Sequence, residues 1–130
     1  MDVKTLMSRA VRHNRHREAI IHGDRRLTFG EAWSRGNRLA NALLGLGLKP
    51  GDRVAVLEDN SIQAADFFNG AASANLVRVP MYPRNGRDAH VHMMTHTGCK
   101  ALVVSEKYRT EIAGIENEVP LDALHQPVLK

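Results

Sequence analysis

Three histidines in one predicted helix are the first residues that could do chemistry. His90, His92 and His96 lie within residues 88–97, and the i, i+4 spacing of the last two would let their rings share a metal ion. A protein zinc site needs three or four ligands with oriented outer partners. No cysteine pair or carboxylate stands at ligand spacing, and the helix lacks the glutamate of an H-E-x-x-H motif. We therefore expect a solvated or partly packed histidine face and no metal site.

The single cysteine and one pair of adjacent acids are the next candidates. Cys99 follows the C-terminus of a predicted helix, where the helix dipole opposes thiolate formation, so we expect a buried structural cysteine. Glu58 and Asp59 follow a predicted parallel strand, at the edge where α/β proteins usually form sites. These carboxylates could contact a ligand, or they could interact with the dipole of the helix that follows. The sequence leaves both interpretations open.

The glycines do not form a phosphate-binding loop. Gly45-Leu46-Gly47 ends a predicted helix, whereas a phosphate-binding loop opens one. Neither G-x-x-x-x-G-K-[ST] nor a G-x-G-x-x-G that follows a strand occurs in the sequence. We therefore predict no catalytic, cofactor-binding or metal-binding residue within these 130 residues.

Positive charge is concentrated at the N-terminus. Residues 1–26 hold seven bases and three acids, which equals the whole formal charge of +4, while the remaining residues balance. Such a surface could meet lipid headgroups, nucleic acid or an acidic partner, or could be merely solvated. Few residues are aromatic and most fall on predicted core faces, so nucleic acid is the least expected partner. The candidate membrane or anion surface consists of Arg9, Arg12, Arg15 and Arg17.

Composition indicates a folded protein of a reducing compartment. A hydrophobic fraction of 43% suffices for a core, and one cysteine cannot form an internal disulfide. The first ten residues do not resemble a signal peptide, and no apolar run is long enough to span a membrane. We expect one cytoplasmic domain at residues 1–119, peripheral to the inner membrane surface if the arginines bind lipid. Residues 120–130 are expected to form a ragged end.

Helices and strands alternate along the chain and would position these residues. A short helix is expected at residues 2–12. A β-hairpin should follow, because residues 19–22 and 25–28 are strand-like and flank Gly23-Asp24.

A long helix and a buried strand come next. Thr28 and Glu31 have the spacing of a capping box, and Gly47 with Pro50 ends the helix that they open. The apolar run at residues 54–57 is typical of a strand covered on both faces.

The second half repeats this alternation. Asn60 or Ser61 would cap a helix, and Asn75 would end it in a left-handed conformation. The expected core face of that helix is Ile62, Ala65, Phe68 and Ala72. The remaining elements are strands at 77–80 and 101–104, a helix at 88–97, and a last short helix capped by Ser105 that carries Tyr108, Ile112 and Ile115.

This order predicts an α/β fold. Strands that alternate with helices imply right-handed crossovers and a parallel sheet. We expect a three-layer-type parallel (mixed) sheet with flanking helices, plus the N-terminal β-hairpin.

The motifs together resemble one family, the adenylate-forming (AMP-binding) enzymes. Leu27-Thr28-Phe29-Gly30-Glu31 looks like part of its opening, and Gly47 to Leu57 is similar to its second block. Within the family the likeness is greatest to acyl-CoA synthetases, the fatty-acid–CoA ligases. The sequence departs from the family at Gly30, where a better helix former is usual, at Asn75-Leu76 in place of Gly-Ala, and at Tyr82 in place of Asn. The other matching stretches are Ala19-Ile20-Ile21, Asn37 to Leu43, Asn60-Ser61, Val79-Pro80, Pro83-Arg84 and Ala101 to Val104.

The resemblance implies a reaction and assigns this chain a structural part in it. The parent enzyme would convert an acid and ATP to an acyl-AMP and pass the acyl group to CoA, so ATP, Mg and CoA are its implied cofactors. No position here matches the family's phosphate loop, adenine motif, hinge or catalytic lysine. We therefore expect an N-terminal fragment of an ATP-dependent acyl-CoA ligase, partial in fold and not catalytic by itself. The motif residues with an expected scaffold role are Thr28, Glu31, Gly51, Asp52, Arg53, Pro83 and Arg84.

A different class of function stays open. The chain could be a stand-alone α/β binding or dimerisation module with a basic N-terminal surface. The expected partners are the remainder of the parent enzyme, a second copy joined through an exposed sheet edge or apolar face, or a membrane surface.

Overall fold

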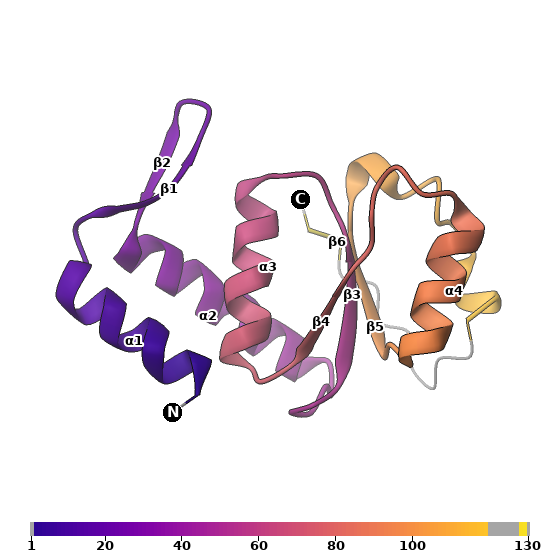
Figure 1. The fold of residues 1–130 in the computed structure, drawn as a ribbon, viewed down its shortest axis with the longest axis horizontal. Helices are drawn as coiled ribbons and strands as arrows, with labels where there is room; N and C mark the ends of the chain where they lie inside the picture. Colours follow the sequence, from indigo (N-terminus) through magenta and orange to yellow (C-terminus); the bar gives the residue numbers. More distant parts are fainter. Residues whose placement is uncertain (1, 120–127, 130) are drawn as a thin grey trace. The chain divides into compact units, whose positions relative to one another are not determined.

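The computed structural model describes residues 2–119 and 128–129, and the chain divides into two compact units. Unit 1 comprises Met1–Pro50 with Asn60–Asn75, and unit 2 comprises Gly51–Asp59 with Leu76–Lys130. Figure 1 shows the helices and hairpin of the first unit and the parallel strands of the second. The alternation of helices and strands predicted from the sequence is confirmed.

Unit 1 is built from helices and one hairpin. Helix α1 is Val3–Asn14, strands β1 and β2 are Glu18–His22 and Arg25–Thr28, and helices α2 and α3 are Phe29–Gly45 and Ile62–Ser73. The strands of the hairpin pair antiparallel, and α2 packs against both other helices.

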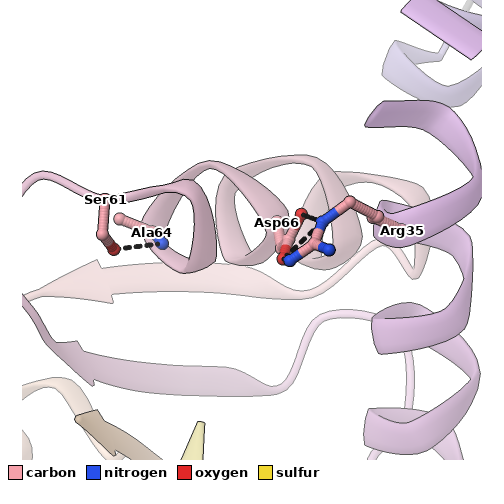
Figure 2. Close-up of polar contacts among 4 residues, drawn as sticks. All are labelled: Arg35, Ser61, Ala64 and Asp66. Carbon is pink, nitrogen blue, oxygen red and sulfur yellow. Dashed lines mark hydrogen bonds and ion pairs between the residues drawn. The ribbon is translucent and has the colours of Figure 1, made fainter. Parts of the chain in front are cut away.

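Local signals begin and end these helices as the sequence predicts. Thr28 Oγ1 accepts a hydrogen bond from Glu31 N at 3.2 Å, and Glu31 Oε2 accepts one from Thr28 N at 2.8 Å, which completes the capping box. Ser61, not Asn60, caps α3 by accepting from Ala64 N at 3.0 Å (Figure 2). Gly47 and Asn75 are left-handed, with φ of 92° and 57°.

Two glycines let α2 and α3 approach closely. A Cβ added to Gly70 would lie 2.9 Å from the carbonyl oxygen of Gly36, and one added to Gly36 would lie 2.9 Å from the Cβ of Asn69. Neither position has space for a larger side chain, so the helix backbones are in near contact.

The core face of α3 differs from the prediction. Phe67 is buried, whereas Phe68, which helical spacing predicts to be in the core, is 53% exposed. Helical periodicity favoured a stripe through Phe68, but the actual contact line with α2 runs through Asp66 and Gly70. That line turns the neighbouring Phe67 inward.

Unit 2 is a parallel sheet with helical connections. Strands β3, β4 and β5 are Arg53–Leu57, Val77–Pro80 and Ala101–Ser105, and helix α4 is Arg87–Thr97. The sheet order is β4-β3-β5-β6, and every pairing in it is parallel, as predicted for the first three strands. Strand β6 is Val128–Leu129; the rest of the predicted ragged end lies outside the described residues.

Apolar side chains of the sheet face α4 and the turns that follow β5. Ala55 and Leu57 of β3 and Leu102 of β5 join one buried cluster with Met94 and Ile115. This cluster is the core of unit 2, and it holds the ends of the strands in a fixed register.

The predicted last helix is wrong. Residues after β5 form two 3-10 segments, η1 (Glu106–Tyr108) and η2 (Ile115–Asn117), and Ser105 makes no capping hydrogen bond. Gly114 is left-handed at φ 77°, which interrupts any continuous helix between them. Ile112 and Ile115 are nevertheless buried as that prediction required.

Candidate functional site

Polar side chains follow two of the strands in unit 2 at the carboxyl edge of the sheet. Leu57 at the end of β3 is in register with Val104 of β5, so the segments that follow these strands begin side by side. Glu58 and Asp59 follow β3, and Lys107 and Tyr108 follow β5. In parallel α/β sheets this edge is where ligands usually bind.

Asp59, Lys107 and Tyr108 form one polar cluster at that edge. Asp59 Oδ2 lies 2.5 Å from Lys107 Nζ, and the Tyr108 hydroxyl donates a hydrogen bond to Asp59 Oδ1. The Lys107 ammonium also lies 5.2 Å from the centroid of the Tyr108 ring. The neighbouring Glu58 Oε1 accepts from Asp59 N at 2.8 Å.

The contacts keep all three groups in their ordinary charge states at neutral pH. Hydrogen bonds from Lys107 and then Tyr108 lower the pKa of Asp59, and the same carboxylate raises the pKa of Lys107 and of Tyr108. An ionised acid paired with a protonated lysine serves poorly as a base or nucleophile. Asp59 therefore ties the end of β3 to η1, a role that the sequence did not indicate.

This cluster should stabilise the protein fully over a range of pH that has an acid limit and an alkaline limit. A lowered Asp59 pKa gives stability that is complete above the ordinary value near 4 and is lost as the pH falls through the folded-state pKa. Raised Lys107 and Tyr108 pKa values give stability that is complete below about 10 and lost as the pH rises through the folded-state values. In a carboxyl-detected NMR titration, Lys107→Met should raise the Asp59 pKa more than Tyr108→Phe does. An Asp59 pKa that neither variant moves would contradict the cluster.

Five of the predicted scaffold residues lie in unit 2, at the two ends of its sheet, whereas Thr28 and Glu31 form the capping box of α2 in unit 1. Gly51 is left-handed at φ 89°, and the backbone carbonyls of Asp52 and Arg53 accept from Val77 N and Lys100 N, both at 2.8 Å. Gly51 to Arg53 thus anchors the starts of all three strands.

The Pro83-Arg84 pair lies at the opposite, carboxyl edge. The two residues occupy a turn in which Asn85 N donates to Tyr82 O at 3.0 Å. The Arg84 side chain is exposed and contacts no charged partner within the described residues.

The structure separates the four N-terminal arginines into two pairs. Arg9 and Arg12 lie on α1, exposed and without an ion-pair partner in the part of the chain that the structure describes. Arg15 and Arg17 follow the helix, and their carbonyl oxygens accept from Gly30 N at 3.1 Å and Phe29 N at 2.9 Å. The first pair is available to a partner, whereas the backbone of the second fastens α1 to the start of α2.

Among the described residues, no helix is both long and apolar enough to cross a bilayer.

The histidines of α4 pack against each other or are buried. His92 and His96 stack with their centroids 5.7 Å apart, while His90 is buried. The described residues include no cluster of three or more potential metal ligands. Cys99 is buried, as predicted, and burial raises the pKa of its thiol.

Sequence reasoning missed a largely buried ion pair in unit 1. Arg35 Nε donates to both carboxylate oxygens of Asp66, at 2.9 and 3.1 Å, and Arg35 Nη2 donates to Asp66 Oδ2 at 2.7 Å (Figure 2). The two side chains are 28% and 12% exposed. A lone acid between apolar residues in α3 was the available signal, but its partner lies 31 positions away.

Comparison with known proteins gives this arrangement a family. Feruloyl-CoA synthase from an Amycolatopsis species is 32% identical over 107 residues, which are 82% of this chain and 22% of that protein. Malpibaldin synthetase from Mortierella alpina is 34% identical over 88 residues, 68% of this chain and 2% of that protein.

The fold is similar to that of solved acid–CoA ligases. A benzoate CoA ligase from Burkholderia xenovorans LB400 matches with a TM-score of 0.90 and 22% identity, covering 100% of this chain and 26% of that chain. The chain thus spans at most 26% of the length of these three proteins. The AMP-binding enzyme family matches over residues 7–129, and the chain therefore belongs to that family.

Proposed function

We propose that this chain forms the N-terminal α/β part of an ATP-dependent acyl-CoA ligase. The whole enzyme would activate a carboxylic or fatty acid as an acyl-AMP and transfer the acyl group to CoA. The observation that carries the proposal is the family match over residues 7–129, with a feruloyl-CoA synthase among the relatives.

Within such an enzyme these residues would be scaffold. The sequence has no phosphate-binding glycine loop, and the described residues offer no metal-ligand cluster. ATP, Mg²⁺ and CoA are therefore proposed for the whole ligase and are not assigned to residues of this chain. The contribution proposed for this part is to hold the carboxyl edge of the sheet in register, through Asp59, Lys107 and Tyr108.

The source gene offers a direct test. Its reading frame should continue beyond Lys130 into a loop rich in serine, threonine and glycine that ends in Pro-Lys-Gly. The protein encoded by that frame should release pyrophosphate from ATP in the presence of Mg²⁺ and an acid, and should form the CoA thioester when CoA is added. A frame without that loop would favour the alternative, a stand-alone binding or dimerisation module.

Dimerisation through the sheet edge is the second candidate function, and β4 is the edge that favours it. Val77 and Met81 donate their N–H groups to the carbonyl oxygens of Asp52 and Val56 in the direction of β3. Residues 78 and 80 alternate with them and direct their backbone groups away from β3. Pro80 is one of those alternate residues, and it has no N–H to offer a second chain. We therefore propose a homodimer through β4 that Pro80 keeps weak.

Replacing Pro80 should strengthen this dimer. Pro80→Val restores one outward donor on the edge, and light scattering should then show a larger dimer fraction at equal protein concentration. Pro83→Val, in the turn beyond the strand, serves as the control and should leave the mass unchanged. Equal masses for the wild type and Pro80→Val at every concentration would rule out this edge.

A peripheral membrane role for α1 is a further proposal. Val3 and Leu6 are 51% and 53% exposed, and they lie on the same helix as the unpaired Arg9 and Arg12. Exposed apolar and basic residues on one helix suit the boundary of an anionic bilayer, here the cytoplasmic face of a membrane.

Loss of the two free arginines should weaken lipid binding. Each contributes about 1 kcal/mol near anionic lipid, so Arg9→Gln with Arg12→Gln should reduce binding to phosphatidylserine vesicles about thirtyfold in a sedimentation assay. Arg38→Gln with Arg84→Gln removes the same charge elsewhere and should have a much smaller effect. Equal losses for both double variants would mean that lipid binding depends on total charge and not on α1.

A further inference from the structure

A cavity in unit 1 is lined by side chains from all of its helices and from the first strand of its hairpin. Its volume is about 220 Å³, and its wall is mainly apolar. Small side chains at Ala10 of α1 and Ala32 of α2 leave this space unfilled. The larger lining residues are Met7, Val11, Ile20, Phe29, Trp33 and Asn69.

Two hydrogen-bonding side chains in this wall have no partner among the residues that the structure describes. Neither the Trp33 indole N–H nor the Asn69 carboxamide makes a hydrogen bond to another described residue, and both side chains are half-buried. An indole can only donate, whereas a carboxamide can donate and accept. A molecule that satisfied both would need a hydrogen-bond acceptor, and it would gain from carrying a donor beside it.

The size and charge of the wall narrow the ligand further. An apolar cavity of about 150 Å³ holds benzene, so this larger one can hold one ring with a small substituent. No charged side chain of the described residues lines the space, which disfavours an ion because its charge would lose hydration without compensation. An apolar wall with a few polar groups is typical of small-molecule sites.

We propose that this cavity binds a small neutral aromatic molecule that carries an amide-like group, with its ring between α1 and α2 and its polar group toward Trp33 and Asn69. The proposal rests on unit 1 alone and does not depend on the ligase function. Its test uses neither ATP nor CoA, so the two can fail separately.

Benzamide is the probe, and Trp33 reports its binding directly because it is the only tryptophan in the chain. Titrating the full 130-residue chain with benzamide should change the fluorescence in a saturable way, with half-saturation at or below a few millimolar. Benzoate has the same size but a charge, and it should bind at least tenfold more weakly at neutral pH. A response that never saturates, or tighter binding of benzoate, would overturn the proposal.

Two variants test the position of the site. Ala10→Leu fills the space and should abolish saturable binding, and Asn69→Leu keeps the bulk but removes the amide and should weaken binding about tenfold. Ala42→Leu adds the same side chain at an exposed position of α2 and should leave binding unchanged. Circular dichroism establishes that each variant is folded, and chemical-shift changes in ¹H–¹⁵N spectra should cluster at the lining residues. Benzamide binding that survives both Ala10→Leu and Asn69→Leu in folded protein would place the ligand elsewhere and refute the assignment.

Discussion

Replacing Gly70 with alanine should destabilise the protein by about 2 kcal/mol, although alanine is the better helix former. The added Cβ would lie 2.9 Å from the carbonyl oxygen of Gly36 and 3.2 Å from the Cβ and Cγ of Leu39. The nearest of these atoms is helix backbone and cannot rotate away, so α2 and α3 would have to move apart. Separating them exposes apolar surface along the contact.

The matched control is another helical glycine with open space around it. Apart from its chain neighbours and the backbone of its own helix, no atom of a described residue lies within 4 Å of a Cβ added to Gly45 at the end of α2. Gly45→Ala should therefore be neutral or should stabilise the protein by up to about 1 kcal/mol. Urea unfolding followed by circular dichroism measures both changes. A Gly70→Ala variant as stable as Gly45→Ala would mean that the helices are not in near contact.

Local chemistry explains why much of the fold was predictable. The capping box at Thr28 and Glu31, the glycine at Gly47 and the left-handed Asn75 each act within a few residues of their own position. A sequence pattern contains all the information that such a feature needs. The same holds for the alternation of helices and strands, which predicts a parallel sheet.

The incorrect predictions depend on contacts between distant residues. Phe67 and Phe68 are adjacent in the sequence and equally apolar, so helical periodicity alone cannot decide which of them is buried. The helix predicted after Ser105 has good apolar spacing, but it is interrupted at Gly114, while its isoleucines are still buried. In both cases tertiary packing overrides the local preference.

The polar contacts were beyond reach for the same reason. Asp59 is 48 positions from Lys107, and only the register of β3 and β5 brings them together.

Gly30 departs from the residue that is usual in the family, and the packing around it explains why a glycine stands there. A Cβ there would lie 2.9 Å from Cγ of Arg15, so the glycine leaves space for that side chain at the start of α2.

Removing Asp66 should have an effect as large as that of Gly70→Ala. Asp66→Ala would leave Arg35 without its bidentate partner in a half-buried position, and we expect a loss of about 2–3 kcal/mol in the free energy of unfolding. The loss measures the cost of an unpaired charge, so the double variant Arg35→Met with Asp66→Ala should recover part of it. The wild type, Arg35→Met, Asp66→Ala and the double variant form a double-mutant cycle. We expect its coupling energy to be about 2 kcal/mol.

The exposed pair of Arg26 and Glu18 provides the comparison for this cycle. Its Nη1–Oε2 distance of 2.8 Å is similar, but its side chains are 56% and 52% exposed, so its coupling energy should be below about 0.5 kcal/mol and should fall in high salt. Similar coupling energies for the two pairs would contradict the argument from burial.

Arg35 and Asp66 stand beside Gly36 and next to the turn that carries Gly70, so both perturbations act on the same contact between α2 and α3. Once Gly70→Ala has forced the helices apart, the ion pair is already weakened. The combined loss for Gly70→Ala and Asp66→Ala should therefore be smaller than the sum of the single losses.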